Sequence, residues 1–309
     1  MPCRPGGPPL LLLLACVALA GCSVRSLAVR ALGNSLAGAG DVFASDEDPE
    51  LVRDALPFAL KTMEALLAQR PDDRNLLLSA CSGFTQYSWA FVETDALLAE
   101  PEDLGEARRL EDRALKLYLR GRDDCLHALD LERPGIREAL ETHPEEAVGA
   151  FGPDDVELLY WTGASWGAAI GLGLDRPELT VDLPAVRALM ERVLELDERF
   201  QAGAAHEAMI ALDGVPRTMG GSPERAREHF ERAVELSAGR RAGPYLSLAR
   251  SVAIPEQDVE TFRDVLRETL AIDPDADPSV RLANLIAQRR ARFLLDHVED
   301  YFLDAGEGG

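Results

Sequence analysis

Residues 59–71 read ALKTMEALLAQRP, and the spacing within this stretch decides the fold class. Ala59, Met63 and Leu66 follow one another at intervals of four and three, which places them on one face of a helix. Pro71 comes five residues later, and proline closes a helix because it lacks a backbone N–H and clashes with the preceding turn. The stretch therefore predicts an amphipathic helix that ends just before Pro71.

The same spacing recurs in three further stretches, which indicates an internal repeat. These are Val186, Met190 and Val193 with the helix ending 194–197, then Ala226, Phe230 and Ala233, and finally Phe262, Leu266, Thr269 and Pro274. The second helix of a tetratricopeptide unit has this pattern, but here it does not recur at that unit's period of about 34 residues. Evidence for strands is confined to residues 156–161, which lead directly into a helix-like run of small residues. We predict an all-α protein, an antiparallel helix-pair array of degenerate tetratricopeptide-like repeats.

The N-terminus carries the pattern of a bacterial lipoprotein signal. Arg4 is followed by an apolar run over 10–20 and then by Leu-Ala-Gly before Cys22. The run is shorter than the about 20 residues that a membrane-spanning helix needs. We therefore expect a signal peptide at 1–21 that is cleaved, lipidation of Cys22 and a periplasm-facing protein. Ser23 is not the acidic residue that causes retention in the inner membrane, which favours the outer membrane.

Composition divides the rest of the chain. Residues 22–45 are small and mostly uncharged, as in a flexible tether, residues 46–304 form the helical domain, and residues 305–309 are an expected disordered tail. Cleavage removes one positive residue, Arg4, from a chain of formal charge −22, so the mature chain carries −23. Such a surface repels nucleic acid and anionic lipid headgroups, so contact with the membrane is expected through the lipid alone.

The cysteines left after processing and lipidation are Cys81 and Cys125. Export permits a disulfide between them. Both lie in apolar helical contexts, however, and we expect two separate buried thiols.

Three short motifs resemble sites of chemistry, and each is incomplete. Ser165 sits in Gly-Ala-Ser-Trp-Gly, the G-x-S-x-G pattern of a nucleophile elbow, but the parallel strands of a hydrolase are missing and the glycines fit a close helix crossing. His206 begins an H-E-x-x-H zinc motif whose last position is Ile210. The aspartates at 273–277 lack the glycine and glutamate of a calcium loop and read as helix caps. We expect no enzyme, no metal and no cofactor, with a serine hydrolase using Ser165 as the weaker alternative.

Longer motifs resemble those of the TatT family, the lipoprotein T component associated with tripartite ATP-independent periplasmic (TRAP) transporters. They are GFTQY at 83–87, LRGRD at 119–123, YWTG at 160–163 with Trp166-Gly167, MGG at 219–221, and LAN at 282–284 through QRRA at 288–291. These stretches are distributed over most of the mature chain. The resemblance implies a helical bundle that assembles as a homotrimer, receives the transporter's periplasmic solute-binding protein and passes on a small, hydrophobic ligand. An envelope scaffold of the same fold is the alternative.

Candidate ligand-binding residues follow from chemistry, since the family has no short binding signature. Tyr160, Trp161 and Trp166 gather beside the glycine-smoothed helix and fit either an apolar cleft or the core, of which we favour the core. Arg289 and Arg292 share a helix face, while Arg290 points elsewhere. Each of these arginines could form an ion pair with a nearby carboxylate or bind an anionic ligand. Ser222 and Pro223 predict a helix N-terminus after the 219–221 loop.

Overall fold

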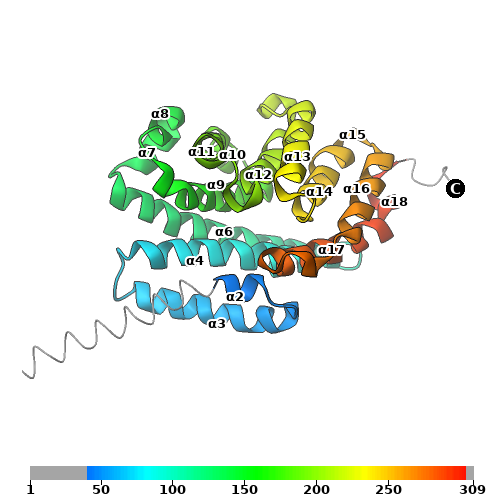
Figure 1. The fold of residues 1–309 in the computed structure, drawn as a ribbon, viewed down its shortest axis with the longest axis horizontal. Coiled ribbons are helices and arrows are strands. Elements are labelled where there is room, and N and C mark those ends of the chain that lie inside the picture. Colours follow the sequence, from blue (N-terminus) through cyan, green and yellow to red (C-terminus); the bar gives the residue numbers. More distant parts are fainter. Residues whose placement is uncertain (1–39, 304–309) are drawn as a thin grey trace, which may run out of the picture.

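The computed structural model describes residues 40–303, and every regular element within that range is a helix (Figure 1). This confirms the all-α prediction, while the tetratricopeptide-like character of the repeats stays a prediction. Residues 156–161, the strand-like run, lie in helix α9. The signal peptide, Cys22, most of the tether and the tail lie outside the described residues.

The first half of the chain is built around four long helices. Its elements are α2 (Gly40–Ala44), α3 (Pro49–Leu67), α4 (Arg74–Tyr87), the π-helix η1 (Ser88–Glu93), α5 (Thr94–Ala99), α6 (Leu104–Glu132), α7 (Ile136–Thr142), α8 (Pro144–Val148), the 3-10 helix η2 (Pro153–Asp155) and α9 (Val156–Gly171). Helix α2 lies within the segment expected to be the tether and contacts α17, so folded structure begins a few residues before the expected boundary.

The second half alternates long helices with short turns. Its elements are α10 (Pro177–Thr180), α11 (Leu183–Asp197), η3 (Phe200–Ala202), α12 (Ala204–Asp213), η4 (Arg217–Met219), α13 (Pro223–Ser237), α14 (Gly243–Leu248), the π-helix η5 (Ala249–Ala253), α15 (Ile254–Glu256), α16 (Val259–Ala271), η6 (Pro274–Ala276), η7 (Pro278–Val280), α17 (Arg281–Asp296) and α18 (Val298–Tyr301). Within residues 40–303, no helix is both long and apolar enough to span a bilayer.

Local sequence explains where these helices begin. The side chains of Asp48, Asp73 and Asp103 accept hydrogen bonds from first-turn N–H groups of α3, α4 and α6, which would otherwise be unpaired. Ser222 caps α13 with Pro223 in its first turn, as predicted. Asp273 and Asp277 cap η6 and η7, which confirms that this aspartate run ends one helix and starts the next.

The helices pack in chain order, and the chain then returns on itself. Helix α3 packs on α4, α4 on α6, α6 on α9, α9 on α11, α11 on α12 and α12 on α13. The C-terminal helix α17 comes back to contact α2, α3 and α5 (Figure 1). Ile286 of α17 belongs to the apolar cluster of the N-terminal helices, and Leu97 of α5 belongs to the C-terminal cluster. The two ends of the folded body thus share core residues.

Cys81 and Cys125 form a disulfide that joins α4 to α6, so the expectation of two separate thiols is wrong. Their Cα atoms lie 5.5 Å apart. Gly121 explains the close approach, because a Cβ at this position would lie 2.9 Å from the carbonyl oxygen of Cys81. An apolar helical context shows that a thiol is buried, but it does not show which residue of the next helix faces it.

Candidate functional site

The three aromatic candidates on α9 separate into two environments. Trp166 is buried, and its indole Nε1 donates a hydrogen bond to Asp182 Oδ2 at 3.2 Å. The guanidinium of Arg122 lies 5.5 Å from the centre of the same indole. Trp166 is therefore a core residue whose polar atom is paired, in line with the core reading favoured from the sequence.

Tyr160 and Trp161 lie together and remain partly exposed. Their ring centres are 5.1 Å apart, and Phe200 lies 5.3 Å from Tyr160. Arg241 and Glu207 form an ion pair at 3.0 Å beside them. Burial, reinforced by Glu207, raises the pKa of Tyr160 to about 12, so its hydroxyl stays protonated as a hydrogen-bond donor. Of the three aromatic candidates, Tyr160 and Trp161 are the two whose side chains are not fully buried, and ligand contact at them stays a prediction.

Ser165 lies in the middle of α9 and is fully buried. Its hydroxyl donates to the carbonyl oxygen of Thr162 at 3.0 Å, an ordinary bond within a helix. A nucleophile elbow requires a strand, a strained turn and an exposed serine, and none of these is present at this position. The neighbouring glycines serve packing: a Cβ on Gly163 would lie 2.8 Å from Met190 of α11.

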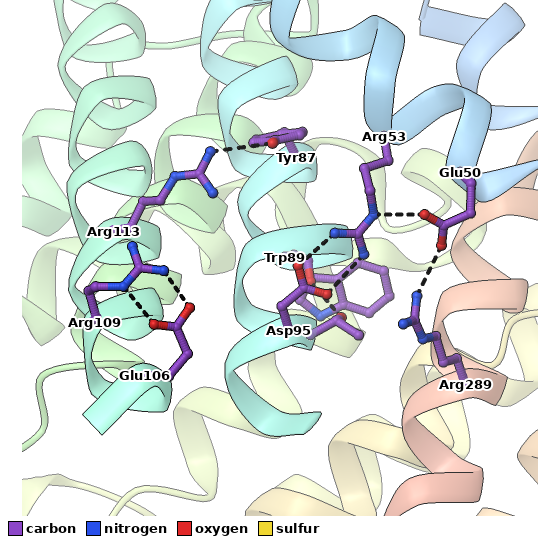
Figure 2. Close-up of polar contacts among 10 residues, drawn as sticks. Glu50, Arg53, Tyr87, Trp89, Asp95, Glu106, Arg109, Arg113 and Arg289 are labelled. Atoms are coloured by element: carbon purple, nitrogen blue, oxygen red, sulfur yellow. Dashed lines mark hydrogen bonds and ion pairs between the residues drawn. The ribbon is translucent and has the colours of Figure 1, made fainter. Parts of the chain in front are cut away.

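Arg289 is an exposed member of an ion-pair row that joins three helices. Figure 2 shows Arg53 of α3 between Glu50 and Asp95, with Arg289 of α17 reaching the same Glu50. The Arg289–Glu50 contact is 3.3 Å, and Arg53 donates two hydrogen bonds to Asp95 at 2.6 and 2.9 Å. Trp89 lies next to Asp95 in the same view. Arg289 therefore has a structural partner, the outcome usual for an exposed charge.

Arg290, next in the chain, points away from Arg289 as predicted from the helix spacing, but its burial was not predicted. It is 0% exposed and donates through Nη2 to Glu93 Oε1 at 2.6 Å, while its guanidinium lies 5.3 Å from the centre of the Trp89 ring. Glu93 also accepts from Tyr118 at 2.7 Å and from Arg250 at 3.2 Å. The arginine cluster was visible in the sequence. Its position on a helix face could not show that Arg290 would pair with Glu93, which lies 197 residues earlier in the chain.

The electrostatics of this group are set by burial and by charge pairing. Burial alone would raise the pKa of Glu93, but Arg290, Arg250 and the hydroxyl of Tyr118 outweigh it and hold the value at about 2. Burial together with Glu93 raises the pKa of Tyr118 well above its usual range. Glu93 is therefore ionised and Tyr118 is protonated at any physiological pH.

The two π-helices of the described chain meet at this point. Glu93 is the last residue of η1, and Arg250 lies in η5. π-Helical turns are rare and occur frequently at functional sites. We call Trp89, Glu93, Tyr118, Arg250 and Arg290 the π-helix junction. Across residues 40–303, no group of three or more potential protein ligands is arranged to hold a metal ion.

Comparison with known proteins agrees with the resemblance seen in the sequence. The family described as "TRAP transporter T-component" matches residues 45–302. A protein of Treponema pallidum (strain Nichols), which bears the name "Uncharacterized protein", is 32% identical over 309 residues, covering 94% of this chain and 95% of its own length.

Proposed function

The chain belongs to the TRAP transporter T-component family, and we propose from this that it acts as a lipid-anchored accessory that docks a periplasmic solute-binding protein. The observation that carries the proposal is the extent of the family match, which spans the folded body from residue 45 to residue 302. A TRAP-associated role in the cell envelope follows from membership itself. Docking, ligand transfer, anchoring and assembly as a homotrimer are the parts that we propose.

The N-terminal sequence supports the anchor. Cys22 follows a lipoprotein-type cleavage pattern, and several acyl chains hold a protein on a membrane where a single chain is marginal. The mature charge of −23, obtained by removing Arg4 from a chain of −22, keeps the body away from anionic headgroups. We place the protein on the outer membrane with its body in the periplasm.

The chemistry of the interior supports a binding role over catalysis. Ser165 is buried and bonded to its own helix, and the elements around it do not form an elbow. Tyr160 and Trp161 offer apolar ring surface next to the Arg241–Glu207 pair, a combination that suits a small ligand with an apolar body and one polar group. We assign ligand contact to Tyr160 and Trp161.

The test is a pull-down of the tagged native lipoprotein from mildly solubilised envelope, followed by mass spectrometry of proteins and extracted small molecules. Recovery of a periplasmic solute-binding protein supports the proposal, and recovery of an apolar small molecule identifies the cargo. A Tyr160→Ala/Trp161→Ala variant should lose the small molecule and keep the protein partner, whereas a Glu106→Gln variant, altered in an exposed ion pair with Arg109, should keep both. Recovery of envelope structural proteins alone contradicts docking and favours a scaffold.

A further inference from the structure

Two histidines meet in the contact between α12 and α13. His206 Nδ1 lies 2.7 Å from His229 Nδ1, a hydrogen-bond distance between two ring nitrogens. His206 is buried, and only 19% of the His229 side chain is exposed. At this separation the two facing nitrogens hold one proton between them, because two N–H groups cannot point at each other.

The neighbours of His206 decide which ring carries that proton. His206 Nε2 lies 3.2 Å from Glu198 Oε1, and an ionised carboxylate only accepts hydrogen bonds. Arg232 holds Glu198 in its ionised form through two further hydrogen bonds. His206 must therefore carry its proton on Nε2, which leaves its Nδ1 as the acceptor. His229 donates from Nδ1 and, as a neutral ring, has no proton on Nε2.

The far side of His229 faces a buried acceptor. Its Nε2 lies 3.6 Å from Asp213 Oδ2, beyond hydrogen-bond distance. Asp213 is 0% exposed, and its other oxygen, Oδ1, contacts Arg187 at 2.9 Å and Arg225 at 2.7 Å. Oδ2 has no hydrogen-bond partner. Two acceptors without a hydrogen thus face each other in the interior, an arrangement that one added proton completes.

We propose that His229 and Asp213 form a proton-binding site, and that the histidine pair acts as a two-step acid-responsive lock between α12 and α13. In the first step, one proton from solvent forms a new N–H bond at His229 Nε2, and this N–H donates to Asp213 Oδ2. In the second step, a proton added at His206 Nδ1 removes the acceptor of the His229 N–H. Two imidazolium rings then lie with their centres 5.0 Å apart. The first proton adds a hydrogen bond across the α12–α13 contact, and the second removes the hydrogen bond between the two histidines.

Charges from three elements surround the pair, while the order of the two steps follows from the geometry, in which His229 Nε2 is the ring nitrogen that neither carries nor accepts a proton. Arg187 of α11 and Arg225 of α13 flank Asp213, with Glu191 of α11 nearby, and Arg232 and Glu198 flank His206. Burial lowers the pKa of both histidines, and for His229 the neighbouring His206 lowers it further. Both steps therefore lie on the acidic side of the ordinary histidine range.

The lock reaches the loop between α12 and α13. The backbone N–H of Ser222 donates to the carbonyl oxygen of Asp213 at 2.8 Å, and Arg225 donates to both Asp213 and the carbonyl oxygen of Gly220. Loop 214–222 contains Met219-Gly220-Gly221, and Met219 is exposed. Asp213 precedes the first residue of this loop and accepts a hydrogen bond from its last residue, Ser222. Loosening the α12–α13 contact would therefore release the loop from Asp213.

The test is a titration of the full-length lipoprotein labelled with ¹⁵N at histidine, followed by NMR from about pH 8 to about pH 4.5. At the alkaline end we expect the proton on Nε2 of His206 and on Nδ1 of His229. On acidification His229 should become doubly protonated before His206. A proton on Nδ1 of His206 at the alkaline end, or protonation of His206 before His229, overturns the proposal.

Hydrogen exchange provides the second measurement. Protection of loop 214–222, corrected for intrinsic exchange, should fall between the first and second steps in the wild type by about tenfold, the change that corresponds to about 1.4 kcal/mol. His206→Gln should abolish this fall, and His127→Gln should retain it. If His206→Gln does not fold, the wild-type titration alone decides. Unchanged protection across the titration contradicts the lock.

Discussion

Replacing Glu93 by glutamine is the sharpest test of the π-helix junction. The change preserves shape and removes one negative charge. Arg290, 0% exposed, then keeps its positive charge in the interior with no ionised partner, and Arg250 adds a second positive charge nearby. Glutamine offers one acceptor oxygen in place of two, so either Tyr118 or the pair of arginines then faces the amide NH₂, and the loss includes a hydrogen bond as well as the charge.

The magnitude follows from the pKa of Glu93. Its partners lower this pKa from 4.5 to about 2 against the opposing effect of burial. At about 1.4 kcal/mol per pKa unit, this preference for the ionised form corresponds to roughly 3 kcal/mol. Breaking a buried ion pair by removing one partner costs about 3–5 kcal/mol in general, which agrees. The Glu93 side chain is only 13% exposed, so solvent screening reduces the figure little.

The same contribution should depend on pH in a defined direction. A carboxyl whose pKa is lower in the folded state stabilises the fold above its unfolded pKa and ceases to do so as the pH falls through its folded pKa. For Glu93 that interval runs from 4.5 down to about 2. The difference in stability between wild type and Glu93→Gln should therefore be complete at neutral pH and shrink within this interval.

Urea denaturation at neutral pH measures the effect as a shift in midpoint at constant slope. Glu50→Gln is the matched control, because Glu50 is exposed, and weakening its pairs with Arg53 and Arg289 should cost at most about 1 kcal/mol. Adding Arg290→Met to Glu93→Gln should restore at least half of the loss, since it removes the unpaired charge. A loss for Glu93→Gln no larger than that of Glu50→Gln would refute the reasoning.

Three further predictions concern helix packing, the disulfide bond and membrane anchoring. Gly167→Leu should cost about 1–3 kcal/mol, because even a Cβ there lies 3.2 Å from the branched side chain of Val186, while Gly171→Ala, with open space around it, should leave the melting temperature nearly unchanged. Reduction of the Cys81–Cys125 bond, which spans a sequence separation of 44, should lower the free energy of unfolding by about 4 kcal/mol on the chain-entropy model, measured by denaturation with and without reductant. Cys22→Ser should move the protein from the membrane fraction to the soluble fraction on immunoblots, and unchanged partitioning would point to another anchor.

The periodicity of the sequence predicted which residues share a buried face within a single helix. Ala59, Met63 and Leu66 are buried together on α3, and Phe262 and Leu266 are buried together on α16, because a spacing of three or four fixes the face before any neighbour is known.

Contacts between distant helices could not be predicted in the same way. The disulfide depends on the close approach of α4 and α6 at Gly121, and the burial of Arg290 depends on the return of α17 to η1. The aromatic candidates show both cases: helix position identified a cluster on α9, but only packing separated Trp166 in the core from Tyr160 and Trp161 near the surface.

The return of α17 also changes how the whole body should respond to perturbation. In an open array each unit contacts only its neighbours, so its ends unfold independently. Here Arg281 donates to the carbonyl oxygen of Ser45 at 2.7 Å, Arg289 pairs with Glu50 and Arg290 pairs with Glu93. One helix near the C-terminus thus contacts α3, η1 and the turn after α2. Of these contacts only Arg290–Glu93 is buried, and buried charge pairs are costly to open singly. We therefore expect the π-helix junction to couple the two ends into one cooperative unit, so that a partner that alters the contact between η1 and α17 would act on the fold as a whole.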